Sequence, residues 1–262
     1  MTYANPAAYE RFMGRWSARL APFFLRFASV EDARRVLDVG CGTGTLARAA
    51  ISAGLAAEIT GIDPVPEYVA FAREAVPHGR AEFHVGDAAS LAFPRGSFDA
   101  ALSLLVLQEF VDPRPAVTEM ARVTRAGGIV ATCLWDFQDG LPMLSLFWRA
   151  AEAVAPEDVR RQRQGNASRP HATPGDLQDL WQRCGLTNIE TATLEIAMEF
   201  SSFEDYWDPF LGGSTPTSAF AAALERQTGG VVTRALRDLI AGVRADGSFV
   251  LPARAWAVKG RV

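Results

Sequence analysis

Along the first half of the chain, short apolar runs alternate with longer segments in which apolar residues recur every three or four positions. Apolar runs of about four to eight residues are typical of buried strands, and the longer period is typical of amphipathic helices. Strands that alternate with helices form a parallel sheet with helices on both faces. We therefore expect a doubly wound α/β domain whose first five strands are Val36–Val39, Glu58–Asp63, Ala81–Val85, Ala100–Leu105 and Ile129–Trp135.

The second half of the chain has a less regular pattern. An apolar helix is expected at Leu141–Val154, and the polar, arginine-rich stretch Pro156–Pro170 is expected to form a surface or mobile segment. Ile189–Met198 and Phe249–Gly260 alternate in the manner of a sixth and a last strand. Residues 201–246 lie between these two and show the period of two or three helices. This insertion is the candidate for a cap that faces a substrate.

Residues 7–28, ahead of the first strand, carry aromatic and aliphatic side chains at helical spacing. A helix this apolar must pack on the domain. It either covers the core or serves as a lid over a bound cofactor, with Arg15 meeting a carboxylate of that cofactor.

Composition narrows the class of protein without naming a function. Of 262 residues, 49% are hydrophobic, which suffices for one large domain or for a domain with a cap. The net charge is −4 and basic residues do not cluster, so no nucleic-acid partner is expected. No apolar run approaches the roughly 18 residues of a membrane span, and the first residues lack the apolar core of a signal peptide. Three separated cysteines argue against a disulfide framework or a zinc site and favour a reducing cytoplasm.

Candidate chemistry begins directly after the first strand, with Gly40, Gly42 and Gly44. Glycine allows positive φ and a close approach of backbone to ligand, and we expect Thr43 or Thr45 to cap the helix that follows. Strand, glycine turn and helix together form a crevice suited to a ligand. The dinucleotide fingerprint is G-x-G-x-x-G, and Thr45 stands here at its last glycine position, which weakens a diphosphate-binding interpretation.

The string Leu37–Gly44, LDVGCGTG, closely resembles the first motif of class I methyltransferases that use S-adenosylmethionine. Tyr9–Trp16 is similar to the N-terminal segment of many bacterial small-molecule methyltransferases, and the resemblance covers about residues 9–135. It implies a seven-stranded sheet whose last strand is antiparallel. It also implies that the glycine turn lies against the amino-acid part of the cofactor, through Asp38, Gly40, Cys41 and Gly42.

Two further acids are expected to complete the cofactor site. Asp63 ends the second strand at the spacing, about 20 residues beyond the glycines, where a carboxylate can accept both ribose hydroxyls. The resemblance implies that Asp87 accepts from the adenine amino group and that the backbone amide of Ala88 meets the ring. The remaining cofactor contacts that we expect are Pro64, Leu104 and Gln108.

The sequence motifs identify catalytic residues less clearly than they identify cofactor contacts. The family often carries Leu-His-His after the fourth strand, whereas this chain has Leu107–Glu109, LQE, so a role for the first histidine does not carry over. Glu109 and His171 are candidate general bases, although each also suits a purely structural position. Trp135, which ends the fifth strand, and Trp207, in an aromatic stripe that a plain core would also explain, are candidate substrate contacts. No spacing typical of metal ligands occurs, so no metal is expected.

Together these patterns predict a single methyltransferase domain over residues 1–262, with an N-terminal helical lid at 1–30 and cap segments at 136–172 and 200–248. The expected activity is methyl transfer from S-adenosylmethionine to a small-molecule acceptor, by alignment and desolvation of the nucleophile. Two alternatives stay open: a non-catalytic protein that retains the cofactor pocket, and a nicotinamide or flavin oxidoreductase. No membrane partner is expected, and the sequence does not name the acceptor, the methylated atom or the oligomeric state.

Overall fold

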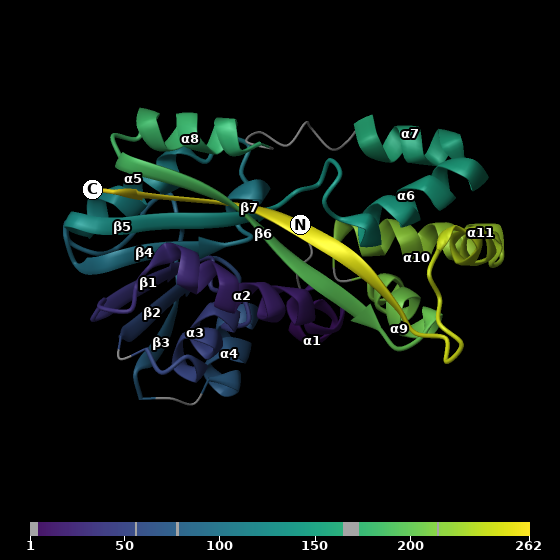
Figure 1. The fold of residues 1–262 in the computed structure, drawn as a ribbon, viewed down its shortest axis with the longest axis horizontal. Coiled ribbons are helices and arrows are strands. Elements are labelled where there is room, and N and C mark those ends of the chain that lie inside the picture. The colour runs from purple at the N-terminus through teal and green to yellow at the C-terminus, as the bar shows by residue number, and fades with distance from the viewer. Residues whose placement is uncertain (1–4, 56, 77–78, 165–172, 214) are drawn as a thin grey trace. The chain divides into compact units, whose positions relative to one another are not determined.

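A computed structural model describes residues 5–55, 57–76, 79–164, 173–213 and 215–262. Within these ranges, seven strands form a sheet in the order β3-β2-β1-β4-β5-β7-β6 (Figure 1). The first five strands pair in parallel, and β7 pairs antiparallel with β5. The predicted doubly wound sheet with an antiparallel last strand is therefore confirmed. The strands are β1 Arg35–Val39, β2 Glu58–Asp63, β3 Ala81–Val85, β4 Phe98–Leu104, β5 Thr124–Trp135, β6 Thr187–Phe200 and β7 Phe249–Arg261.

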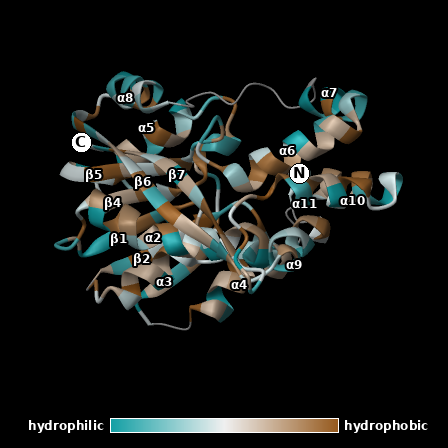
Figure 2. Ribbon diagram, turned by 45° about the vertical axis from the view of Figure 1, so that its right-hand side comes forward, coloured by the Kyte–Doolittle hydropathy of each residue, from teal (hydrophilic) through white to brown (hydrophobic). Residues whose placement is uncertain are grey.

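The central strands are apolar on both faces, as parallel strands between two helical layers must be. Leu37 and Val39 of β1 are fully buried, and so are Ala101 and Leu102 of β4, whose side chains point to opposite faces of the sheet. Figure 2 shows hydrophobic residues along β5 and β7 as well. This apolar pattern places the core on both sides of β1 and β4.

Helices cover both faces of the sheet (Figure 1). On one face, Leu25 and Leu46 surround a small apolar cavity together with Val36. On the other, Met120 and Trp181 share a buried cluster with the sheet. None of the described helices is long and apolar enough to cross a membrane. The first face carries α2 Arg15–Ala28, α3 Thr45–Ser52 and α4 Pro66–Ala75, and the second carries α5 Arg114–Val123 and α8 Pro174–Arg183.

Besides shifts of one or two residues at several strand ends, three features differ from the prediction. The expected helix at 7–28 is broken, because a π-helical turn at Glu10–Gly14 separates α1 Pro6–Tyr9 from α2. Neither predicted threonine caps α3: the cap is Gly44, and the Thr45 hydroxyl accepts a hydrogen bond from Arg48 instead. β5 begins at Thr124, five residues before the expected start, because α5 ends at Val123 and the chain turns directly into the sheet.

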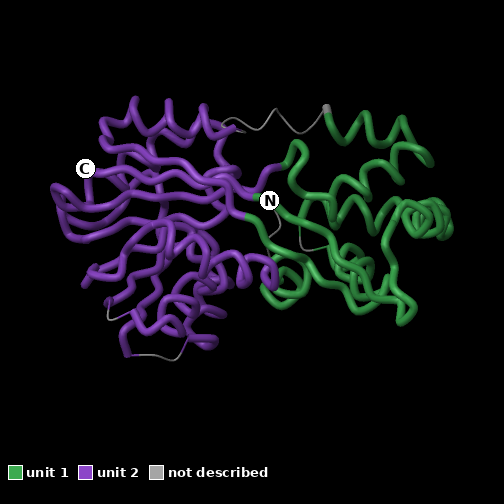
Figure 3. Tube along the Cα trace, in the orientation of Figure 1, with its two compact units in different colours: residues 1–13, 137–168, 195–254 green, residues 14–136, 169–194, 255–262 purple. Residues whose placement is uncertain are grey.

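The chain divides into two compact units, which Figure 3 colours separately. Unit 1 comprises residues 1–13, 137–168 and 195–254, and unit 2 comprises residues 14–136, 169–194 and 255–262. The predicted cap segments 136–172 and 200–248 fall mainly in unit 1, and the predicted lid at 1–30 is divided between the units. Their roles as cap and lid stay predictions.

Unit 1 is helical and is built around aromatic side chains. The ring of Phe147 lies 5.5 Å from that of Phe210 and 5.9 Å from that of Trp207. The Tyr206 hydroxyl donates to the Met143 carbonyl at 2.8 Å. Aromatic pairs of this kind contribute about 0.5–1.5 kcal/mol each beyond their buried area, so the cluster joins α6 to α9. Besides α1, the helices of unit 1 are α6 Pro142–Val154, α7 Pro156–Gln164, α9 Phe203–Trp207, α10 Pro216–Thr228 and α11 Val231–Leu239.

Candidate functional site

The candidate site is centred on the loop at residues 40–44, which joins the carboxyl end of β1 to α3 in unit 2. The amides of Gly40 and Cys41 both donate to the Ile62 carbonyl of β2, at 2.8 and 2.9 Å. On the other side, the Arg48 guanidinium of α3 donates to the Thr43 carbonyl at 2.6 Å. The loop is thereby held between a strand and a helix.

Gly40 and Gly42 both take positive φ angles, of 73° and 51°, but their surroundings differ. A Cβ atom on Gly40 would lie 2.5 Å from the Val106 methyl carbons, so no side chain fits there. A Cβ atom on Gly42 would meet nothing within 4 Å. The backbone at Gly40 is therefore closed against the segment after β4, whereas the space over Gly42 is open to a ligand.

Asp63, at the carboxyl end of β2, holds the same loop through its side chain. Its two carboxylate oxygens accept hydrogen bonds from the amides of Gly42, at 3.0 Å, and Val65, at 2.9 Å. The residue is 8% exposed; burial raises the pKa of its carboxyl group, and the two amide hydrogen bonds lower it. A carboxylate has about four acceptor sites, which leaves one on each oxygen for a hydroxyl donor. This geometry suits the predicted ribose contact, which stays a prediction.

Asp38 is a second buried acid beside the loop, two residues before Gly40. It is 1% exposed, and its Oδ2 atom has no hydrogen-bond partner in the described part of the chain. Burial, and then the neighbouring Asp63 carboxylate, raise the pKa of Asp38 to about 7. A bound positive charge would lower that pKa and stabilise both carboxylates. The pair therefore favours a ligand that carries positive charge over an anionic ligand.

The segment after β3 reaches the same edge of the sheet. The amide of Gly86 donates to the Asp63 carbonyl at 3.1 Å, which joins this segment to the end of β2. Asp87 is exposed, and its Oδ1 atom accepts the Ala89 amide at 2.9 Å. Ala88 is buried. The glycine loop, Asp63 and Asp87 thus lie at the carboxyl ends of neighbouring strands.

The carboxyl end of β4 contains a feature that the sequence did not indicate. Leu105 takes a φ of +64°, which is uncommon for a residue other than glycine, asparagine or aspartate. The turn that it makes directs the next residue, Val106, onto Gly40. Leu104, predicted as a cofactor contact, is half-buried just before this turn.

Gln108 and Glu109 follow in a short 3₁₀ turn at Leu107–Glu109. The Gln108 carboxamide oxygen accepts the Trp135 amide at 3.3 Å, which ties the turn to the end of β5. Trp135 is 4% exposed, whereas Glu109 is exposed. The end of β4 and the end of β5 therefore meet through Gln108, and the candidate base Glu109 lies on the outer side of this turn.

Three further predicted cofactor contacts, Arg15, Cys41 and Pro64, stay predictions. The Arg15 guanidinium lies over the Trp16 ring, 4.3 Å from its centre. Burial raises the pKa of the Cys41 thiol, which suits a packed side chain and not a nucleophile. Pro64 is exposed directly after Asp63.

Trp207, predicted as a substrate contact, belongs to the aromatic core of unit 1. It is 3% exposed, and its indole N–H donates to the Thr233 hydroxyl at 2.8 Å. That hydroxyl in turn donates to Glu225. His171 lies outside the described residues.

Sequence reasoning missed Arg48, which holds the glycine loop from α3. It donates to the Thr43 carbonyl and, at 3.1 Å, to the Thr45 hydroxyl. An arginine one turn into the helix that follows a glycine loop was the available signal. The loop carbonyls there lie within reach of a long side chain that starts on that helix.

A mostly parallel sheet with a glycine loop after its first strand, an acid ending the second and an acid following the third is the arrangement that the resemblance to class I methyltransferases implies. Residues 37–132 match the family model described as "Methyltransferase domain". This segment is therefore a methyltransferase domain, and the resemblance inferred from the glycine motif is confirmed.

Individual proteins agree with this assignment. The 2-methyl-6-phytyl-1,4-hydroquinone methyltransferase of Synechocystis is 36% identical over 114 residues, which are 43% of this chain and 36% of that protein. An uncharacterized methyltransferase of Mycobacterium tuberculosis is 36% identical over 134 residues, which are 50% of each chain. The chain thus spans about a third to a half of the length of these curated relatives.

A solved structure shows the same fold over the full chain. Phosphoethanolamine N-methyltransferase 2 of Haemonchus contortus, in complex with phosphomonomethylethanolamine and S-adenosylhomocysteine, superimposes with a TM-score of 0.61 at 20% identity. The match covers 100% of this chain and 58% of that one. At this identity the comparison supports the fold alone.

Proposed function

We propose that the chain is an S-adenosylmethionine-dependent methyltransferase that acts on a small-molecule acceptor. The observation that carries the proposal is the open backbone at Gly42, hydrogen-bonded to the buried Asp63 at 3.0 Å. This arrangement lies within the segment that matches the methyltransferase domain. At one place, Gly42 offers an open backbone, and the Asp63 carboxylate offers two hydrogen-bond acceptor sites and negative charge.

The groups at this place fit the proposed cofactor. S-Adenosylmethionine carries a sulfonium, an ammonium and two ribose hydroxyls, which match the acids Asp38 and Asp63. An acid that ends the second strand would suit the ribose of a dinucleotide as well. Thr45, however, occupies the position of the last glycine in the dinucleotide fingerprint. The loop sequence therefore supports the methyltransferase interpretation over an oxidoreductase.

When bound, S-adenosylmethionine supplies a methyl group that its sulfonium already activates. The protein's part is to bind, to orient and to exclude water. In our proposal the loop at 40–44 binds the amino-acid part of S-adenosylmethionine. Asp63 binds its ribose, and Asp87 and Ala88 bind its adenine. Alignment of this kind can lower a barrier by roughly 7–11 kcal/mol, so the chemistry does not require a nucleophilic side chain.

The acceptor side of the proposal is supported by the names of relatives and by the distribution of charge. The names of the Synechocystis and Haemonchus proteins each refer to a small-molecule substrate, and basic residues in this chain do not cluster. Glu109 and His171 stay candidate general bases, and Trp135 and Trp207 stay candidate substrate contacts. Loss of turnover at unchanged cofactor affinity in a variant of one of these residues would identify it.

Replacement of Asp63 by alanine tests the cofactor site. Asp63→Ala is expected to weaken S-adenosylhomocysteine binding at least tenfold, because two charge-assisted hydrogen bonds of about 1.5–3 kcal/mol each are lost. Isothermal titration measures this. Glu58→Ala is the matched control, since Glu58 is an exposed acid at the opposite end of the same strand. Equal dissociation constants for all three proteins would remove Asp63 from the site.

The same preparation separates the two alternatives. An increase in melting temperature with NAD, and none with S-adenosylhomocysteine, would favour the oxidoreductase. Tight binding of S-adenosylhomocysteine without methyl transfer to any compound of a metabolite library would favour the non-catalytic protein. Methyl transfer to one such compound supports the enzyme.

A further inference from the structure

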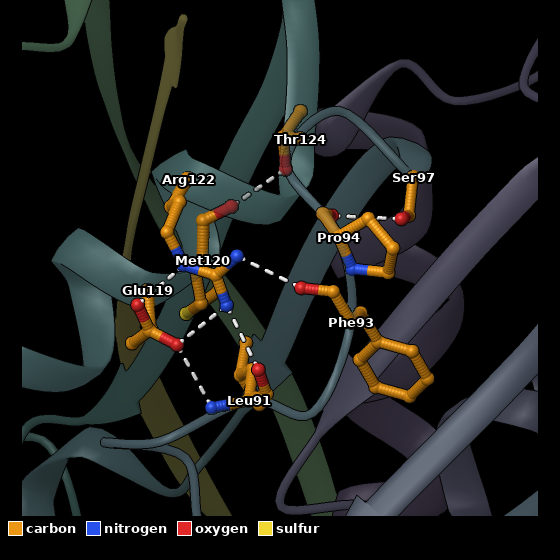
Figure 4. Close-up of polar contacts among 8 residues, drawn as sticks. All are labelled: Leu91, Phe93, Pro94, Ser97, Glu119, Met120, Arg122 and Thr124. Carbon is orange, nitrogen blue, oxygen red and sulfur yellow. Dashed lines mark hydrogen bonds and ion pairs between the residues drawn. The ribbon is translucent and has the colours of Figure 1, made fainter.

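Two side chains of α5, Glu119 and Arg122, form hydrogen bonds with the backbone of the segment that follows β3, as Figure 4 shows. The Leu91 amide donates to Glu119 Oε2 at 2.8 Å, and the Leu91 carbonyl accepts from Arg122 Nη2 at 2.8 Å. Arg122 Nη1 also donates to the Phe93 carbonyl at 2.8 Å. Both polar groups of one residue in the segment are therefore held from a single helix.

Glu119 and Arg122 also bind each other, which fixes both side chains for this grip. Arg122 Nε donates to Glu119 Oε1 at 2.6 Å, and Nη2 donates to Oε2 at 2.8 Å. The hydrogen bond and the charge of Arg122 lower the pKa of Glu119. A guanidinium can hold one carboxylate and two carbonyls at once because its five N–H groups form a rigid planar fork, which a lysine ammonium cannot reproduce.

A tight turn connects the gripped residue to Asp87. The Ser90 amide donates to the Asp87 carbonyl at 3.1 Å, and the Ala89 amide donates to Asp87 Oδ1 at 2.9 Å. Ala88 within the turn and Leu91 directly after it are 6% and 5% exposed, and both pack in the core cluster that contains Met120 of α5. A displacement of Leu91 would therefore move Asp87 and Ala88 with it.

We propose that Glu119 and Arg122 are positioning residues that set the nucleobase selectivity of the cofactor site by holding the turn at Asp87 and Ala88 in place. The inference rests on the proposed function, in which this turn meets adenine. Neither side chain touches the cofactor; both act through the Leu91 backbone. In this arrangement Asp87 accepts from the 6-amino group of adenine and disfavours a base with a 6-oxo group.

The test compares two ligands that differ at that position, S-adenosylhomocysteine and S-inosylhomocysteine, by isothermal titration. The unchanged protein is expected to bind the adenosyl compound at least tenfold more tightly. Arg122→Lys is expected to lose at least fivefold in affinity for the adenosyl compound and to bind the two ligands within about threefold of each other. Glu119→Gln keeps an acceptor for the Leu91 amide, so its ratio of the two dissociation constants is expected to lie between those of the unchanged protein and Arg122→Lys.

The matched control is Arg125→Lys. Arg125 is three residues further along and forms an ion pair with Asp99 at 2.6 Å, at the amino end of β4, so its loss should leave both dissociation constants unchanged. A merely structural role of Arg122 would lower the melting temperature of the unliganded variant without changing the ratio of the two dissociation constants.

Three results would overturn the proposal. The first is an unchanged ratio in folded Arg122→Lys or, if that variant does not fold, in Glu119→Gln. The second is an equal change in Arg125→Lys. The third is no binding of either ligand by the unchanged protein, and only this result would also remove the proposed function.

Discussion

At the scale of single residues, arginine guanidinium groups hold two loops and the edge strand β3 around the candidate site. Arg48 binds the glycine loop, Arg122 binds the segment after β3, and Arg73 donates twice to the Phe83 carbonyl of β3, at 3.0 and 2.6 Å. A rigid fork of donors can satisfy several carbonyls where a loop has no strand partner. The acids have the complementary role, because Asp63 accepts loop amides on its two oxygens.

Asp38 is expected to make stability depend on pH. Its folded-state pKa is about 7 against an ordinary 3.8, so between these values the folded protein retains a proton that the unfolded chain has released. The free energy of unfolding should therefore fall as the pH rises from about 4 to 7, by up to roughly 1.4 kcal/mol per pH unit. Urea unfolding at several pH values measures this slope.

Asp38→Asn separates this slope from the contribution of groups outside the Asp38–Asp63 pair. The asparagine has a similar shape and does not titrate, so the variant should gain stability over the unchanged protein as the pH rises toward 8. Because Asp38 and Asp63 are coupled, the slope belongs to the pair. Parallel stability curves for the two proteins between pH 4 and 8 would show that Asp38 is ionised in the folded state.

At the scale of elements, the glycine loop depends on a contact with a segment far away in the chain. β1 and β4 are neighbours in the sheet, and the turn after β4 places Val106 against Gly40. The strained backbone at Leu105 makes that turn. The site therefore needs both strand ends, and neither strand–loop unit forms it alone.

Gly40→Ala is expected to disrupt the loop. The new Cβ would lie 2.5 Å from the Val106 methyls at a φ of +73°, so the loop must shift, and S-adenosylhomocysteine binding should weaken more than tenfold. Gly54→Ala is the control. It has a similar φ of +75° and open space around the new Cβ, so it should lose only about 1–2 kcal/mol of stability and retain its affinity. Equal affinities for both variants would contradict a role for the Gly40 contact.

At the scale of the whole molecule, each unit is assembled from three separate segments of the chain. β6 and β7 each contribute residues to both units, because they cross the boundaries at 194/195 and 254/255. A unit of this kind is not a contiguous piece that can be removed from the sequence. The sheet of unit 2 is completed only when the last residues of β7 pair with β5.

Truncation after Arg254 tests this dependence. Residues Ala255–Arg261 pair with Trp135–Ile129 of β5, and their removal would leave that strand with an open edge. We expect a large loss of soluble protein and a lower melting temperature, because an unpaired apolar edge promotes aggregation. Removal of Val262 alone is the control, since it costs only the two backbone hydrogen bonds with Gly127 and Gly128 and leaves the pairing of Ala255–Arg261 with β5 in place. A soluble truncated protein with an unchanged melting temperature would contradict the expectation.

The sequence alone determined the strands β1 to β5, the doubly wound fold and the glycine loop with its two following acids. These features follow from local periodicity and from spacing along the chain, which a parallel sheet converts directly into proximity. Only the tertiary structure decided that Gly44 and not a threonine caps α3, that the chain forms two units, and that Glu119 and Arg122 grip Leu91. Those two side chains lie 28 and 31 residues from Leu91, and contacts at such separations depend on how the helices pack on the sheet, which no local pattern encodes.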